Sequence, residues 1–246
     1  MKKPVLYVQA IHKNKLTFDF CYSAMMGAIQ SNIKVKPFKD SSEIPGDPTN
    51  IVVGSVEQCV QWLEQNNFKV PGLIDVSPFE EFMGRTTKVM DISEANIICK
   101  DTPIFIKPAS AIKAFTGFVA DSPFTLQVWS NGYKGEVIVQ PVIEIVSEYR
   151  LYINCHTITG MKHYRGDCLA VFDRELIEKC VDVSYKVLYN HSYTLDFGVL
   201  DDGSTVLIEI NDAWAIGNYG LEPLDYYLMV RNRWLQITGI RIRTEH

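Results

Sequence analysis

Two apolar runs within residues 193–212 stand on either side of the pair Asp202-Gly203, and no other segment restricts the possible folds as strongly. An Asp-Gly pair in this setting is typical of a two-residue type I′ turn, because both turn positions need positive φ. The segment therefore predicts an antiparallel hairpin in which Asp201 pairs with Ser204.

Three side chains that offer oxygen share one face of this predicted hairpin. Counting outward from the turn places Asp196 opposite Glu209, and Asn211 lies two residues further along the same face. Facing carboxylates repel each other, so a bound cation would stabilise the pair. Carboxylate and amide oxygens are ligands of hard cations, which predicts a Mg²⁺ or Mn²⁺ site. In the alternative, both carboxylates project to solvent beside surface cations, although apolar residues flank them closely.

The first part of the chain alternates between strand and helix patterns. Ser55 followed by Gln58 is a capping-box pattern, in which each side chain satisfies the backbone N–H of the other residue at a helix start. The sequence therefore predicts a small α/β subdomain over residues 1–84, with strands at 5–8 and 51–53 and helices at 18–29 and 56–65.

From Pro103 onward the pattern changes to consecutive strands, which favours antiparallel meanders. Helices are predicted near the end, at 174–189 and 224–236, where apolar residues recur at helical spacing. The fold class is therefore α+β, and the predicted strands of this second part are 104–107, 117–120, 125–129, 136–143, 150–154 and 157–164.

Two strand ends carry groups suited to a nucleotide. Lys107 ends an apolar strand and precedes a loop of small residues, where an ammonium group can meet a phosphate. Alternatively, it is an edge-strand lysine whose stem covers apolar surface. Gln140 precedes Pro141, which removes a ladder donor and frees backbone groups that would suit an adenine edge. An ordinary edge-strand proline is the alternative.

Basic residues gather on the next two predicted strands. Arg150 alternates onto one face with Glu148, and Arg165 ends the following strand. Guanidinium groups suit a phosphate in transfer or a substrate carboxylate, through bidentate hydrogen bonds. Each arginine taken singly is equally compatible with an ordinary surface position.

Composition and charge exclude several classes of protein. The net charge is −5 and no basic stripe is present, so nucleic acid is not expected as a partner. No apolar run is long enough for a signal peptide or a membrane span. The six cysteines have no metal-ligand spacing, which favours reduced thiols in a cytoplasmic protein.

Taken in order, these features resemble the ATP-grasp superfamily over roughly residues 85–212. The resemblance is carried by a lysine strand, a glutamine-containing hinge strand and an arginine strand, followed by Asp and Glu-x-Asn on the last hairpin. It is strongest at Ile106-Lys107-Pro108, at Asp196-Phe197-Gly198 and at residues 208–214. Within the superfamily the chain looks most like a small clade of phages and bacteria. Its members share two arginines and a lysine and are proposed carboxylate–amine ligases.

The resemblance implies an ATP-grasp fold over residues 85–246, preceded by the small α/β subdomain. A small lobe at about 85–140 and a large lobe at about 141–246 would grip ATP between them. The implied nucleotide contacts are Lys88, Lys107, Lys113, Gln140 and, through its backbone, Val142. The implied magnesium ligands are Asp196, Glu209 and Asn211, and Arg150 with Arg165 would steady the acyl-phosphate and the substrate carboxylate.

The implied reaction joins a small-molecule or peptide carboxylate to an amine through an acyl-phosphate, with ATP and Mg²⁺ as cofactors. A grasp-type small-molecule kinase and a nucleotide-binding module without turnover are the alternatives. Two departures from the family pattern prevent transfer of a substrate. The loop after Lys107 is poor in glycine, and Asp212-Ala213-Trp214 replaces a serine-rich segment.

Overall fold

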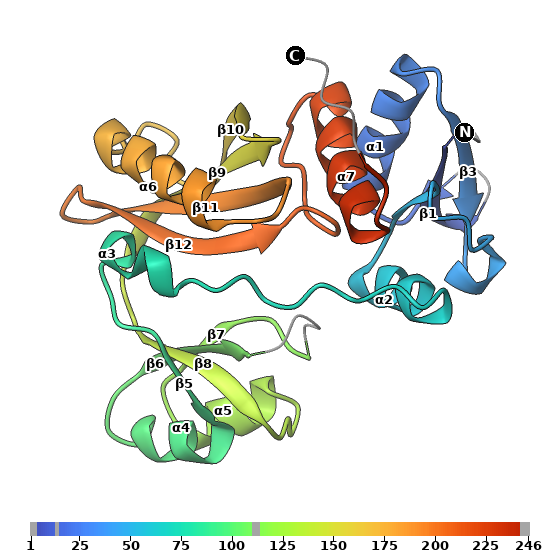
Figure 1. The fold of residues 1–246 in the computed structure, drawn as a ribbon. Coiled ribbons are helices and arrows are strands. Elements are labelled where there is room, and N and C mark those ends of the chain that lie inside the picture. Colours follow the sequence, from blue (N-terminus) through green and yellow to red (C-terminus); the bar gives the residue numbers. More distant parts are fainter. Residues whose placement is uncertain (1–3, 13–14, 110–113, 242–246) are drawn as a thin grey trace.

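A computed structural model describes residues 4–12, 15–109 and 114–241. These residues form three four-stranded sheets with helices packed against them, which is the expected α+β class (Figure 1). Within the described residues, no helix combines the length and apolarity that a membrane span requires. All six cysteines are free thiols, and four of them are buried.

The N-terminal sheet is built around β1 (Val5–His12). This strand pairs in parallel with β3 (Lys34–Phe38) and β4 (Ile51–Val53), and antiparallel with β2 (Lys15–Leu16). Helices α1 (Asp19–Gln30) and α2 (Val56–Gln65) accompany it, with a short 3₁₀ turn at Ser41–Glu43.

Helix α2 begins at the predicted cap. The Oγ atom of Ser55 accepts a hydrogen bond from the Gln58 N–H at 3.4 Å. The second half of the capping box is replaced, because Gln58 accepts from the Ser41 N–H and Gln9 accepts from the Ser55 N–H. Both backbone donors of the capping box are therefore satisfied, the Ser55 N–H by a residue distant in sequence.

The last helix, α7 (Pro223–Ile237), packs against α1 and shares the core of the N-terminal sheet (Figure 1). A Cβ atom on Gly27 would lie 2.1 Å from the Pro223 carbonyl oxygen, so only glycine allows this close approach. The Trp62 and Trp234 ring centroids lie 5.7 Å apart in the same core. Helix α7 is thus anchored on the N-terminal unit.

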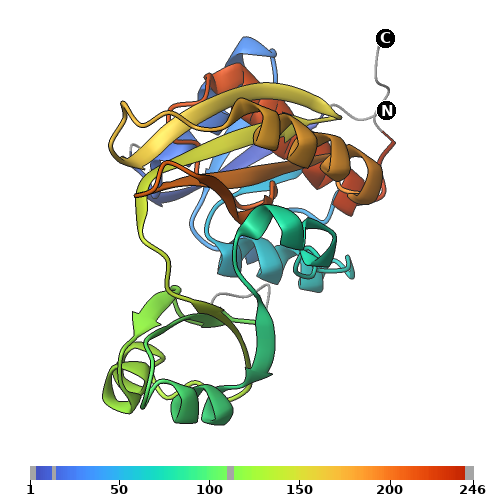
Figure 2. The ribbon, with the colours of Figure 1, turned by 90° about the vertical axis from the view of Figure 1, so that its left-hand side faces the viewer.

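The middle of the chain forms a small lobe that stands apart from the rest in Figure 2. Its antiparallel sheet has the order β5-β8-β6-β7, and α4 (Ile92–Ile98) contributes to its core. The strands are β5 (Lys88–Asp91), β6 (Ile104–Pro108), β7 (Phe118–Ala120) and β8 (Glu136–Pro141). Because β6 lies between β8 and β7, Lys107 is not on an edge strand.

The strand predicted at 125–129 is wrong, because Pro123–Trp129 forms helix α5. The Oγ atom of Ser122 caps the helix by accepting from the Thr125 N–H at 3.2 Å, and Pro123 occupies the first turn. The apolar residues that suggested a strand do not line one face of a sheet. Leu126 is buried, whereas Phe124 and Trp129 are largely exposed.

The large-lobe sheet has the order β10-β9-β11-β12 and is antiparallel throughout. Helix α6 (Arg174–Val187) and the short α3 (Glu80–Met83), preceded by a 3₁₀ turn at Ser77–Phe79, pack on one face. The side chains on the opposite face reach Lys107 of the small lobe. The strands are β9 (Ile145–Asn154), β10 (Thr157–Gly166), β11 (Ser192–Leu200) and β12 (Thr205–Asp212).

The hairpin of β11 and β12 differs from its prediction at the turn. Asp201 does not pair with Ser204; instead, Leu200 donates its N–H to the Ser204 carbonyl at 2.8 Å. The loop therefore holds three residues, and Gly203 supplies the left-handed conformation with φ of 83°. This shifts the register by one residue from the predicted pairing. A bulge at Ile208 shifts it back, so Asp196 does face Glu209.

Candidate active site

Asp196 lies in the middle of β11 and is only 1% exposed, which excludes the solvated alternative for this carboxylate. Arg150 is its direct partner on β9. The guanidinium donates from Nε to Oδ1 at 2.7 Å and from Nη2 to Oδ2 at 2.6 Å. Burial raises the pKa of the Asp196 carboxyl to about 6, although the bonds from Arg150 act in the opposite direction.

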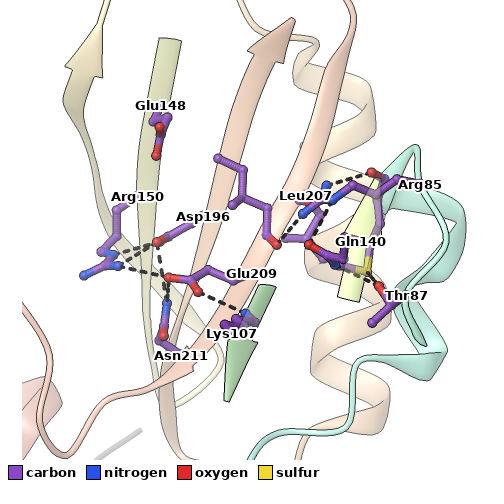
Figure 3. A network of polar contacts seen from close by, with 12 residues as sticks. Arg85, Thr87, Lys107, Gln140, Glu148, Arg150, Asp196, Leu207, Glu209 and Asn211 are labelled. Carbon is purple, nitrogen blue, oxygen red and sulfur yellow. Dashed lines mark hydrogen bonds and ion pairs between the residues drawn. The ribbon is translucent and has the colours of Figure 1, made fainter. Parts of the chain in front are cut away.

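Glu209 lies opposite Asp196 and is about one-third exposed. The Nζ atom of Lys107 lies 3.3 Å from its Oε2, and Arg150 Nη2 lies 3.9 Å from its Oε1 (Figure 3). Lys107 comes from the small lobe, so this ion pair connects the two lobes. Arg150 and Lys107 therefore already offset the repulsion between the two carboxylates, for which the sequence predicted a bound divalent cation.

Asn211 completes the oxygen set on this face. Its Nδ2 donates to Glu209 Oε1 at 2.8 Å and approaches Asp196 Oδ2 at 3.5 Å. A half-turn of the amide would present Oδ1 in place of Nδ2. No group of three or more His, Cys, Asp or Glu side chains suited to a metal occurs among the described residues. Two carboxylates and an amide nevertheless fit Mg²⁺ or Mn²⁺, which takes its remaining ligands from phosphate and water.

A pocket extends from this cluster toward the hinge between the lobes. It brings together three predicted nucleotide residues, Lys107, Gln140 and Val142, with the predicted metal ligand Glu209. Most of its remaining wall is apolar and comes from Phe105, Val119, Pro141, Ile143, Ile145 and Ile208. The pocket therefore combines a mostly apolar wall with the charged groups of Lys107 and Glu209, a combination that suits a nucleotide.

The side chain of Gln140 is buried and already paired at both ends. Its Oε1 accepts from Arg85 Nε at 3.1 Å, and its Nε2 donates to Thr87 Oγ1 at 2.8 Å. Gln140 therefore shapes the pocket wall with a fixed amide.

The remaining predicted site residues are Lys88, Lys113 and Arg165. Lys88 is exposed on β5, and Lys113 lies outside the described residues. Arg165 is 76% exposed at the end of β10 and donates to Glu148 at 2.8 Å, on the strand face that also carries Arg150.

Two contributors were missed by the sequence analysis. Arg85 joins the hinge to β12, because it donates both to Gln140 and to the Ile208 carbonyl. Tyr219 stacks on Tyr164 with centroids 4.6 Å apart, and the Arg150 guanidinium lies over its ring at 4.8 Å. The Gly-Asn-Tyr-Gly stretch at 217–220 indicates a loop, but nothing local shows that it folds back over Arg150.

Residues 82–229 match the family described as the ATP-grasp domain, R2K clade family 2. No curated protein sequence matches the chain significantly.

Solved structures that resemble the chain include an ATP-grasp RimK domain protein from Sphaerobacter thermophilus, with a TM-score of 0.58 and 12% identity over 94% of this chain and 99% of that one. D-alanine–D-alanine ligase from Bacillus anthracis, complexed with ATP, has a TM-score of 0.56 and 12% identity over 96% and 98% of the two chains. N5-carboxyaminoimidazole synthetase from Staphylococcus aureus has a TM-score of 0.55 and 11% identity over 98% and 78%. The family match spans more than half of the sequence and the fold agrees with it, so the chain belongs to the R2K clade of the ATP-grasp superfamily.

Proposed function

We propose that this protein is an ATP- and magnesium-dependent carboxylate–amine ligase that forms an amide or peptide bond and releases ADP and phosphate. One observation carries the proposal. Lys107 of the small lobe meets the face of the large lobe that bears Asp196, Glu209 and Asn211, beside a pocket with apolar walls. Similar folds occur in a ligase complexed with ATP and a synthetase complexed with ADP.

In this proposal the two lobes, at about 85–140 and 141–246, close over ATP, and residues 1–84 precede them. The adenine lies against the apolar wall near Gln140 and the backbone of Val142. Lys88, Lys107 and Lys113 contact the phosphates. Asp196, Glu209 and Asn211 hold Mg²⁺, which when bound neutralises charge on the transferring phosphate.

The first chemical step is attack of a substrate carboxylate oxygen on the γ-phosphorus. The bond from that phosphorus to the β,γ-bridging oxygen breaks, giving ADP and an acyl-phosphate. An amine then attacks the carbonyl carbon, phosphate leaves, and the nitrogen loses a proton. Arg150 and Arg165 orient the acid and stabilise the acyl-phosphate through their positive charge. The bidentate contact is assigned to Arg165, because Nε and Nη2 of Arg150 already bind Asp196.

Hydroxylamine trapping tests the proposal. The protein is incubated with ATP, Mg²⁺, pools of amino acids and small carboxylates, and hydroxylamine, and the products are identified by mass spectrometry. We expect slow ADP formation with ATP alone, and ADP with an equal amount of hydroxamate when the right acid is present. A phosphorylated hydroxyl compound without hydroxamate would identify a kinase. AMP with pyrophosphate would refute the acyl-phosphate route, and ATP binding without any turnover would indicate a binding module.

A further inference from the structure

The bulge at Ile208 decides which side chains of β12 reach the candidate metal site. Between the turn and Phe197 the register follows the three-residue loop, so Phe197 pairs with Leu207. Continued without interruption, this register would place Ile208 opposite Asp196 and turn Glu209 to the other face. Ile208 is instead an extra residue in β12, and it shifts the pairing with β11 by one position. Ile208 and Glu209 then both line the pocket, and Glu209 faces Asp196.

β12 is the edge strand of its sheet, and Arg85 donates to two successive backbone carbonyls at its bulge. Its Nη1 donates to the Leu207 carbonyl at 3.1 Å, and its Nη2 donates to the Ile208 carbonyl at 2.9 Å (Figure 3). These carbonyls belong to the two residues immediately before Glu209. The planar fork of a guanidinium can reach two neighbouring carbonyls at once, which an ammonium cannot do.

Arg85 is itself held from several directions. Its Nη1 also donates to the Met83 carbonyl at 2.9 Å, and its Nε donates to Gln140. Gly84, with φ of 60°, makes the corner before it, and a Cβ atom there would lie 2.7 Å from a methyl group of Val206 on β12. Gly84 therefore packs closely against β12, and the guanidinium of Arg85 is hydrogen-bonded to the same strand. Burial lowers the pKa of Arg85, while the charge of Glu209 opposes this shift.

We propose that Arg85 is a positioning residue that holds the Ile208 bulge, and thereby keeps Glu209 and Asn211 on the face of Asp196. It acts through the backbone of β12. This inference rests on the proposed function, because the three oxygens serve as the metal site there. Arg85 also links the hinge residue Gln140 to β12, the strand that bears Glu209 and Asn211. The proposed reaction does not itself require this link.

Binding of Mn²⁺ and amide exchange test this role without turnover. The affinity for Mn²⁺ is measured by electron paramagnetic resonance on the ADP-saturated protein, and ADP affinity without metal is measured by calorimetry. Hydrogen exchange of the 204–212 segment reports the bulge directly, with residues 104–108 of β6 as internal reference. Arg174→Met is the matched control, because Arg174 lies on an exposed face of α6 and pairs only with Glu178 among the described residues.

In Arg85→Met we expect Mn²⁺ binding to weaken about 10- to 100-fold, the usual effect of losing a group that orients metal ligands. Metal-free ADP binding should change by a smaller factor, and exchange in 204–212 should accelerate while the reference segment stays protected. Arg85→Lys should fall between wild type and Arg85→Met, since one donor group cannot serve both carbonyls. The control should match wild type in every measurement.

Unchanged Mn²⁺ affinity and unchanged exchange in folded Arg85→Met would overturn the inference. If Arg85→Met does not fold, Arg85→Lys decides, and wild-type values in that variant would refute the need for a forked donor. A wild-type protein that binds neither ADP nor Mn²⁺ would refute the proposed function. In that case the exchange experiment alone decides whether Arg85 holds the bulge.

Discussion

Replacing Arg150 with methionine should strongly destabilise the large lobe, because it leaves the carboxylate of Asp196 buried without its cation. Arg150 is 5% and Asp196 1% exposed, and two hydrogen bonds of 2.6 and 2.7 Å join them. At an effective dielectric constant of about 20, unit charges about 4 Å apart attract each other by about 4 kcal/mol. Removing one partner of a buried pair costs about 3–5 kcal/mol. We expect a loss of about 3–4 kcal/mol at pH 8, or roughly 6–16 °C in melting temperature for a chain of this size.

This loss should depend on pH in a definite direction. The pKa of Asp196 is about 6 in the folded protein, above the value of about 3.9 for an unfolded chain. A group with a raised folded-state pKa contributes stability at low pH and loses it as the pH rises through that pKa. Removing Arg150 raises the folded-state pKa further and extends the loss above pH 6. The variant should therefore differ most from wild type at pH 8 and much less at pH 5, where the carboxyl is protonated in both proteins.

Urea unfolding followed by tryptophan fluorescence at pH 8 and pH 5 measures the effect. Arg174→Met removes an exposed ion pair with Glu178 and should change the free energy of unfolding by less than about 0.5 kcal/mol. The double variant Arg150→Met/Asp196→Asn should recover roughly 2 kcal/mol, because no buried charge remains. A cost below about 1 kcal/mol at pH 8, or an equal cost at both pH values, would refute the reasoning.

Four further predictions concern the site and the core. Glu209→Gln should lower turnover roughly 10²- to 10³-fold, as loss of one preorganised electrostatic group does, with little change in melting temperature; a fully active variant would contradict the assigned metal site. Lys107→Ala should weaken ATP binding by about 1.5–3 kcal/mol without loss of the fold, and calorimetry showing unchanged affinity would count against the phosphate contact. Arg165→Lys should lower kcat for the ligation more than it raises the KM for ATP, because an ammonium cannot make a two-pronged contact; equal effects would point to a structural role. Gly27→Ala should cost about 1–3 kcal/mol in thermal unfolding, since the added methyl would meet the Pro223 carbonyl, and an unaltered melting temperature would show that α1 and α7 can separate.

Several local features could be predicted because their causes lie within a few residues. Ser55 caps α2 through the N–H three positions later, and Asp202-Gly203 marks the hairpin turn. The facing of Asp196 and Glu209 was also predicted, although through two errors that cancel. The loop is one residue longer than a type I′ turn, and the bulge at Ile208 restores the register. The sequence gives no local sign of that bulge, because Arg85, which satisfies its carbonyls, lies 122 residues before Leu207.

The mistaken strand at 125–129 has a different cause. Ser122 followed by Pro123 is a recognisable helix start, whereas Leu126 and Val128 after it alternate as apolar residues do in a strand. Alternation predicts a strand only where one face of the segment is buried, and here Leu126 is buried while Phe124 and Trp129 are exposed.

By itself, the sequence determined the elements whose hydrogen bonds close within a few residues, and the family whose motifs it carries. Tertiary structure alone decided that Arg150 neutralises Asp196, that Lys107 reaches Glu209 from the other lobe, and that α7 returns to pack on α1. Arg150 and Asp196 lie 46 residues apart, and the pairing of their strands follows from burying the apolar faces of β9 and β11 under α6. Contacts of this kind depend on how whole elements share a core, and no short pattern of residues encodes that choice.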